Sequence, residues 1–211
     1  MSGIDNFFNI FVVLFVVIDP IGLAPIFVAL THGATKHYQL RMARRSIFIS
    51  ALLLIAFTLI GKQLLTWLGI SLDAFRIAGG LLLFLLSIDM VFARQSGLRS
   101  TTTTEQHEAE EREDISVFPL AIPLVAGPGS MTTMMLMLGD SQNSVDIAII
   151  MAVLLFVLAI AYLSFISAST IMSKLGETGT NVVSRVLGVL LAALSIQYIL
   201  DGLKGSLFSL S

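Results

Sequence analysis

The chain has 211 residues, of which 56% are hydrophobic and 12% charged, and its mean hydropathy is +0.93. Soluble domains carry about 25% charged residues, so this composition indicates an integral membrane protein and leaves no room for a soluble domain. The net charge of −2 says little about partners, and the sequence contains no basic patch for nucleic acid. The absence of cysteine excludes a disulfide framework and a thiolate metal site.

Long apolar runs predict an all-α membrane fold, because about 20 such residues cross a bilayer as a helix. We expect the first run to be a retained span rather than a signal peptide, since neither Lys, Arg nor a small-residue cleavage site precedes Asp19. The predicted spans are residues 6–30, 45–68, 72–93, 116–138, 147–171 and 182–203.

The first span is interrupted near its middle by the sequence Asp19-Pro20-Ile21-Gly22-Leu23-Ala24-Pro25. An Asp at the centre of a membrane helix costs about 2.5–3.5 kcal/mol on insertion scales and usually faces a bundle interior or an aqueous cavity. Each proline removes a backbone donor and frees carbonyls that other groups must satisfy. The segment therefore predicts a broken helix.

The fourth span is interrupted in the same way, by Pro119, Pro123 and the run Gly127-Pro128-Gly129-Ser130. All five prolines of the chain lie in the first and fourth spans. This pairing is the strongest signal in the sequence, and it predicts that helices 1 and 4 are both broken at mid-membrane.

The two halves of the chain resemble each other at an offset of 108 residues. Pro20 then matches Pro128, and the run from Gly80 to Ile88 matches the run that begins at Gly188. Three spans per repeat is an odd number, so residues 1–93 and 116–211 are predicted to be inverted repeats, joined by an acidic cytoplasmic linker at 94–115. Paired broken helices in two such halves indicate a transporter's midplane binding site.

Positively charged residues predict the orientation. With the N-terminus outside, nine Lys and Arg residues fall on the inner side and three, Lys62, Arg76 and Lys204, on the outer side. Both termini are therefore expected to be periplasmic or extracellular. The inner group is Lys36, Arg41, Arg44, Arg45, Arg94, Arg99, Arg112, Lys174 and Arg185.

The breaks provide the predicted substrate site. Each following half-helix presents unpaired N–H groups, which bind an anion such as a carboxylate. Freed carbonyls together with Asp19 suit an ammonium group, a proton or Na⁺. The candidate substrate-binding residues are Asp19, Pro20, Gly22, Pro25, Pro123, Gly127, Pro128, Gly129 and Ser130.

Structural alternatives remain open for these residues. The prolines also fit helices that are merely kinked, and Asp19 also fits a protonated, hydrogen-bonded structural acid. Arg76 and Arg185 are candidates for a gate or an ion pair and equally for interfacial anchors that extend to the membrane surface. Gly79, Gly80 and Gly188 are predicted to allow close helix packing.

Enzyme functions are not supported by the sequence. The three histidines, His32, His37 and His107, lie in predicted loops without metal-ligand spacing. There is neither a nucleophile elbow nor a P-loop. We expect no cofactor, and H⁺ or Na⁺ as the candidate coupling ion.

The motifs at 19–25, 76–80, 119–129 and 176–188 resemble those of the MarC family, and the resemblance runs in order through nearly the whole chain. It implies a six-span bacterial or archaeal inner-membrane protein related to the SnatA-type transporters of glycine, alanine and similar neutral amino acids. It does not imply drug efflux.

These observations together favour a secondary transporter of small neutral amino acids that works by alternating access at the repeat interface. Its partners are then the lipid bilayer and the substrate, while the sequence leaves the oligomeric state open. Two alternatives are a passive small-solute channel and a non-transporting membrane scaffold or regulatory protein. The paired breaks argue against the scaffold, because weakening two of six helices brings it no advantage.

Overall fold

A computed structural model of the chain describes residues 3–92, 114–139, 141 and 143–208. Apart from Asp114 and Ile115, the predicted linker lies outside the described residues. The described helical segments are α1 (Gly3–Ile18), α2 (Leu23–Leu30), α3 (Lys36–Trp67), α4 (Leu72–Phe92), η1 (Ser116–Val125), α6 (Pro128–Gly139), α7 (Ser144–Ile166) and α8 (Ala168–Phe208).

The all-α membrane fold is confirmed. Five segments are long and apolar enough to cross a membrane, and the bent pair of η1 and α6 makes a sixth when it is counted as one span. The first of these segments is the most buried, with 56% of its most apolar window inside the protein against 44% or less for the other four. The five are Phe7–Leu30, Lys36–Trp67, Leu72–Phe92, Ser144–Ile166 and Thr178–Leu207.

The boundaries of the last two predicted spans differ from the observed helices. α7 ends at Ile166, where the backbone N–H of Ser167 bonds the carbonyl of Leu163, whereas the predicted span continued to 171. α8 then begins at Ala168 and is interrupted at Gly176, whose φ of 65° lies in the left-handed region that favours glycine. Apolar residues continue across the end of α7, which is why hydropathy alone did not locate it, whereas Gly176 lies among polar residues in the gap predicted between the last two spans.

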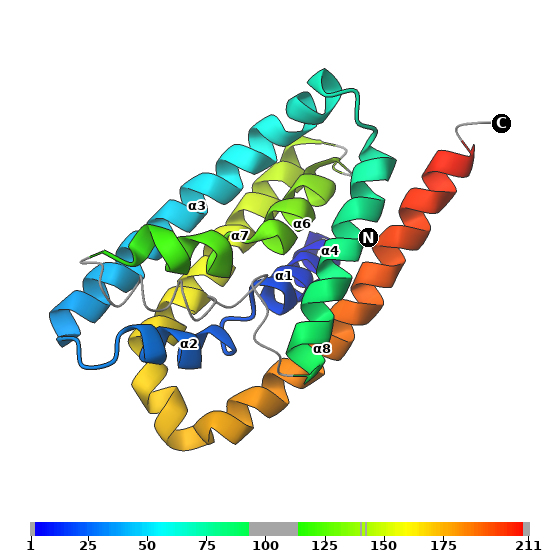
Figure 1. The fold of residues 1–211 in the computed structure, drawn as a ribbon. Helices are drawn as coiled ribbons and strands as arrows, with labels where there is room; N and C mark the ends of the chain where they lie inside the picture. Colours follow the sequence, from blue (N-terminus) through cyan, green and yellow to red (C-terminus); the bar gives the residue numbers. More distant parts are fainter. Residues whose placement is uncertain (1–2, 93–113, 140, 142, 209–211) are drawn as a thin grey trace.

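The helices form a bundle in which α1 and α6 lie among the longer helices α3, α4, α7 and α8 (Figure 1). A buried cluster joins α1, α2, α3, η1, α6 and α7, and in it the rings of Phe27 and Phe165 stack with their centroids 4.7 Å apart. A smaller cluster joins Val16 and Val17 of α1 to α4 and α8. The broken first span therefore runs through the centre of the bundle.

Several contacts between helices occur in matched pairs. α1 contacts α7 as η1 contacts α3, and α2 contacts α8 as α6 contacts α4. Each contact becomes its counterpart when the two halves of the chain are exchanged. This pattern agrees with two related halves, and their inverted relationship stays a prediction.

The last helix of each half packs closely against the other. A Cβ at Gly80 would lie 2.8 Å from the carbonyl oxygen of Ser195, and one at Gly188 would lie 2.8 Å from the Cβ of Met90. Gly202 of α8 lies equally close to the carbonyl oxygen of Asp73, near the start of α4. α4 and α8 therefore run antiparallel, and the glycines allow their backbones to approach.

Candidate functional site

The first break lies between Ile18, the last residue of α1, and Leu23, the first of α2. Asp19 has a φ of 47°, a left-handed conformation that Asp tolerates better than most residues. The following proline disfavours a right-handed helical conformation at this position. Pro25 falls in the first turn of α2, where N–H groups have no intrahelical acceptor, so its lack of an N–H costs the helix no hydrogen bond. The local sequence therefore explains both the break and the restart.

The carboxylate of Asp19 is buried and bonded within the protein. Asp19 is 1% exposed, and its Oδ1 accepts a hydrogen bond from the backbone N–H of Gly22 at 3.0 Å. Oδ2 accepts from the hydroxyl of Ser184 on α8 at 3.2 Å. There is no room for a Cβ at Gly22, because Asp19 and Ser184 fill that space. Asp19 thus closes the start of α2 and ties it to the second half of the chain.

A second serine binds the same break. The hydroxyl of Ser164 on α7 donates a hydrogen bond to the carbonyl of Pro20 at 2.5 Å, and Ser164 is 7% exposed. Our sequence interpretation named neither Ser164 nor Ser184. An isolated serine in an otherwise apolar run, as in Ala161-Tyr-Leu-Ser164-Phe-Ile, is the signal that indicates such a bond between membrane helices.

The second break separates η1 from α6, whose axes differ by 56°. Phe118 and Ile122, each preceding a proline, have extended backbone angles inside η1. The hydroxyl of Ser130 donates to the carbonyl of Val125 at 2.8 Å and so spans the break. A Cβ at Gly127 would collide with the carbonyl oxygen of Pro123. Small and hydroxylated residues are thus required by the tight backbone path.

The start of α6 presents polar groups to the bundle interior. Gly129 and Ser130 are first-turn residues, so their N–H groups have no intrahelical acceptor. One turn further on the same side of α6, Thr133 is fully buried, and its hydroxyl has no hydrogen-bond partner within the described part of the chain. The positive end of the α6 dipole adds to these donors.

The two breaks are neighbours. A Cβ at Gly129 would lie 3.7 Å from Cγ1 of Val17, two residues before Asp19, and 2.9 Å from Cδ2 of Leu83 on α4. Gly79 of α4 faces Thr132, on the same short helix α6. The structure therefore brings together the first and fourth predicted spans at the positions where both are interrupted.

Arg76 and Arg185 are not brought together. Arg76 pairs with Asp73 at 3.5 Å near the start of α4, while Arg185 is exposed near the opposite end of the antiparallel α4–α8 pair. Arg185 directly follows Ser184 along the chain.

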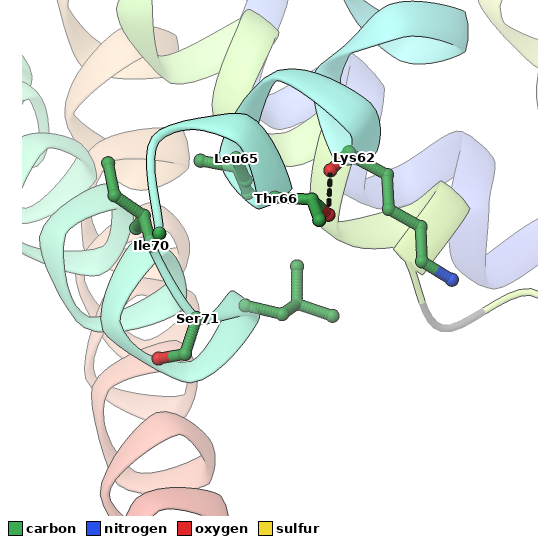
Figure 2. A pocket seen from close by; sticks show the side chains of 7 residues that line it. Lys62, Leu65, Thr66, Ile70 and Ser71 are labelled. Atoms are coloured by element: carbon green, nitrogen blue, oxygen red, sulfur yellow. Dashed lines mark hydrogen bonds between the residues drawn. The ribbon is translucent and has the colours of Figure 1, made fainter.

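Two hollows lie away from the breaks. One of about 420 Å³ is at the turn between α3 and α4, where Leu65 and Ile70 line it and Lys62 extends alongside (Figure 2). The hydroxyl of Thr66 in this hollow donates to the carbonyl of Lys62 at 2.9 Å. The other hollow, of about 400 Å³, lies between α3 and α7.

An ion pair lies just before η1. Burial raises the pKa of Asp114, but hydrogen bonds from the hydroxyl and backbone N–H of Ser116 and the charge of Arg45 outweigh this and hold the pKa below its ordinary value. The Arg45 guanidinium donates to the same carboxylate. This pair fixes the start of η1 to α3.

These features define a polytopic α-helical membrane protein in which two interrupted segments meet inside the bundle. The sequence model described as "MarC family integral membrane protein" matches residues 4–207, and the chain belongs to this family.

Similar proteins come from bacteria and archaea. The UPF0056 membrane protein YvbG of Bacillus subtilis is 36% identical over 197 residues, covering 93% of each chain. A UPF0056 membrane protein of Methanocaldococcus jannaschii is 36% identical over 194 residues, covering 92% of this chain and 94% of its own. YhcE of Escherichia coli is 35% identical, over 94% of this chain and 92% of its own. No solved structure is a significant match.

Proposed function

We propose that this protein is a secondary transporter of small neutral amino acids, and not an enzyme, and that its substrate binds where the two breaks meet. The observation that carries the proposal is the close approach of the start of α6 to the end of α1, where a Cβ on Gly129 would lie 3.7 Å from Cγ1 of Val17. Broken helices that meet inside a bundle are the usual substrate site of transporters built from repeats. The exchanged pairs of helix contacts support the repeat organisation.

The second break suits the substrate carboxylate. Free N–H groups at a helix start bind anions without a basic side chain. The hydroxyl of Thr133 has no hydrogen-bond partner within the described ranges, and helical side chains tilt toward the helix N-terminus, so this hydroxyl adds a donor of the right kind at the start of α6. A carboxylate there satisfies groups that otherwise lie buried without acceptors.

The first break suits the substrate ammonium. Asp19 supplies a carboxylate, and Pro20 supplies a carbonyl that no helical bond uses. Both now accept hydrogen bonds from serines of the second half, Ser184 and Ser164. An ammonium group takes the place of these donors, so binding is linked to movement of one half against the other. The size limit of glycine or alanine follows from the SnatA-type resemblance.

The same proposal places the protein in the bacterial inner membrane with both termini outside, because Lys and Arg residues are concentrated on the other side. The coupling ion is H⁺ or Na⁺, held at Asp19 or at the carbonyls beside it.

Counterflow in proteoliposomes tests the function without knowledge of the coupling ion. Vesicles are loaded with unlabelled glycine, alanine, serine or leucine, and uptake of the labelled amino acid is followed. We expect saturable counterflow for glycine or alanine and at least a tenfold loss in Asp19→Asn. Asp146→Asn is the matched control, because Asp146 lies in the first turn of α7, away from the breaks.

Each alternative gives a different result. Linear flux without stimulation by substrate on the far side indicates a channel. No counterflow from folded, inserted protein contradicts the amino-acid assignment and favours a scaffold or another substrate. Equal flux in Asp19→Asn and wild type removes Asp19 from the site.

A further inference from the structure

An apolar groove follows the outer surface of the bundle between α3 and α7. It encloses about 400 Å³, and none of its lining residues belongs to either break. Its lining residues recur at the spacing of one helix face, four on each helix: Arg44, Ile47, Phe48 and Ala51, and Leu155, Leu158, Ala159 and Tyr162.

Small residues create the groove. α3 and α7 are in contact, and their buried residues Leu54 and Leu158 belong to the same apolar cluster. At the surface Ala51 of α3 and Ala159 of α7 both line the gap, and neither side chain is long enough to fill it. From Arg44 to Ala51 the groove runs about 10 Å, given the ~1.5 Å rise per helical residue. That is most of the ~15 Å thickness of one leaflet's hydrocarbon.

The rim of the groove is lipid-facing in composition. Phe48 is 69% exposed and Leu155 52% exposed. In a membrane span such side chains contact acyl chains. An acyl chain is therefore the immediate neighbour of this opening.

One end of the groove is polar and basic. Arg44 is exposed and lies at this end together with Tyr162. The two ion pairs among the described residues use Arg45 and Arg76, so Arg44 has no acidic partner there. The neighbouring Arg41 is hydrogen-bonded to His37. A guanidinium suits a phosphate diester, which it contacts with two parallel hydrogen bonds.

We propose that this groove is a binding site for an anionic phospholipid, with one acyl chain between α3 and α7 and its phosphate at Arg44 and Tyr162. Charge complementarity decides this occupant. A zwitterionic lipid offers the same chain with no net charge, and basic pockets between membrane helices are typical sites for anionic headgroups.

Native mass spectrometry of the full chain tests the proposal. The protein is equilibrated in detergent with equal amounts of phosphatidylglycerol and phosphatidylcholine of identical chains. We expect wild type to retain several-fold more phosphatidylglycerol. Arg44→Gln removes this preference, whereas the matched Arg41→Gln keeps it, since Arg41 loses the same charge three residues away but does not line the groove.

Filling the groove separates headgroup from chain recognition. Ala159→Leu is expected to reduce retention of both lipids at least threefold, and Ala51→Leu does the same from α3 if the first variant does not fold. Equal retention of the two lipids by wild type contradicts the proposal, as does an equal loss in Arg41→Gln and Arg44→Gln. A dimer that forms in place of lipid adducts, and that Ala159→Leu disrupts, assigns the groove to a second copy of the chain instead.

Discussion

Replacing the unpartnered hydroxyl of Thr133 separates stability from transport. Thr133→Val exchanges Oγ1 for a methyl group of nearly equal size, so the packing of α6 is kept. Thr133 is fully buried, and its hydroxyl has no partner among the described residues. An unpaired buried hydroxyl costs about 1–3 kcal/mol. We therefore expect Thr133→Val to raise the free energy of unfolding by about 1 kcal/mol, the lower end of that range.

The matched control is Thr58→Val on α3. Thr58 is equally buried, but its hydroxyl donates to the carbonyl of Leu54 at 2.5 Å. Loss of a typical hydrogen bond costs about 0.5–1.5 kcal/mol, so this variant is expected to be less stable than wild type. The two substitutions have the same chemistry and opposite expected signs.

Unfolding by denaturant in mixed micelles measures both changes, and counterflow measures function in the same preparations. If the hydroxyl binds the substrate carboxylate, Thr133→Val is more stable and transports several-fold less, while Thr58→Val transports normally. A loss of stability in Thr133→Val as large as in Thr58→Val refutes the reasoning, because the hydroxyl then has a partner. A gain in stability with unchanged transport excludes only Thr133 from the substrate site and leaves the rest of the proposal standing.

Three further substitutions test other contacts. Ser164→Ala leaves the buried carbonyl that it bonds without its donor and is expected to lower the free energy of unfolding by about 1–3 kcal/mol in denaturant titrations, whereas Ser173→Ala, at an exposed site, changes it little. Gly80→Leu forces α4 and α8 apart, costing about 1–3 kcal/mol or more, while Ala78→Leu on the exposed side of α4 is tolerated by the same measure. The pKa of Asp114 is lowered in the folded state, so the ionised carboxylate stabilises the fold above its unfolded pKa of about 3.9, and this stabilisation is lost as the pH falls further. Melting temperatures measured between pH 3 and 7 should therefore fall less steeply at the acid end in Asp114→Asn than in wild type.

The sequence predicted the breaks well because their causes are local. Prolines and the residues before them restrict the backbone wherever the chain goes. The all-α fold and both interrupted segments followed from this, together with hydropathy. The end of α7 did not, because Ser167 interrupts an apolar run that is continuous in composition. The start of α8 at Ala168 was missed for the same reason.

The partners of the breaks were not predictable in this way. Ser164 lies 144 residues from the carbonyl that it bonds, and Ser184 lies 165 residues from Asp19. Bonds between such distant residues depend on how the helices assemble, which no local pattern encodes. A buried carboxylate must also find donors, and the N–H of Gly22 is the nearest one. Asp19 therefore has a structural role beside its proposed role in binding, because it bonds the N–H of Gly22 just before α2. The structural alternative of our sequence interpretation was different, a protonated acid hydrogen-bonded to a neighbouring helix.

This double role bears on how binding drives transport. A ligand shifts a conformational equilibrium only as far as its affinities for the two states differ. Ser164 and Ser184 belong to the second half of the chain, yet they bond the break in the first half. In the proposed mechanism, an ammonium group at Asp19 replaces those bonds and so acts on a contact between the halves. A carboxylate at α6 replaces no bond to the other half, because the groups there are unpaired. The ammonium end is therefore expected to trigger movement and the carboxylate end to supply affinity. Ethylamine should accordingly induce the change in accessibility that acetate does not, as read by labelling of a cysteine introduced at Val183, which leaves the neighbouring Ser184 in place.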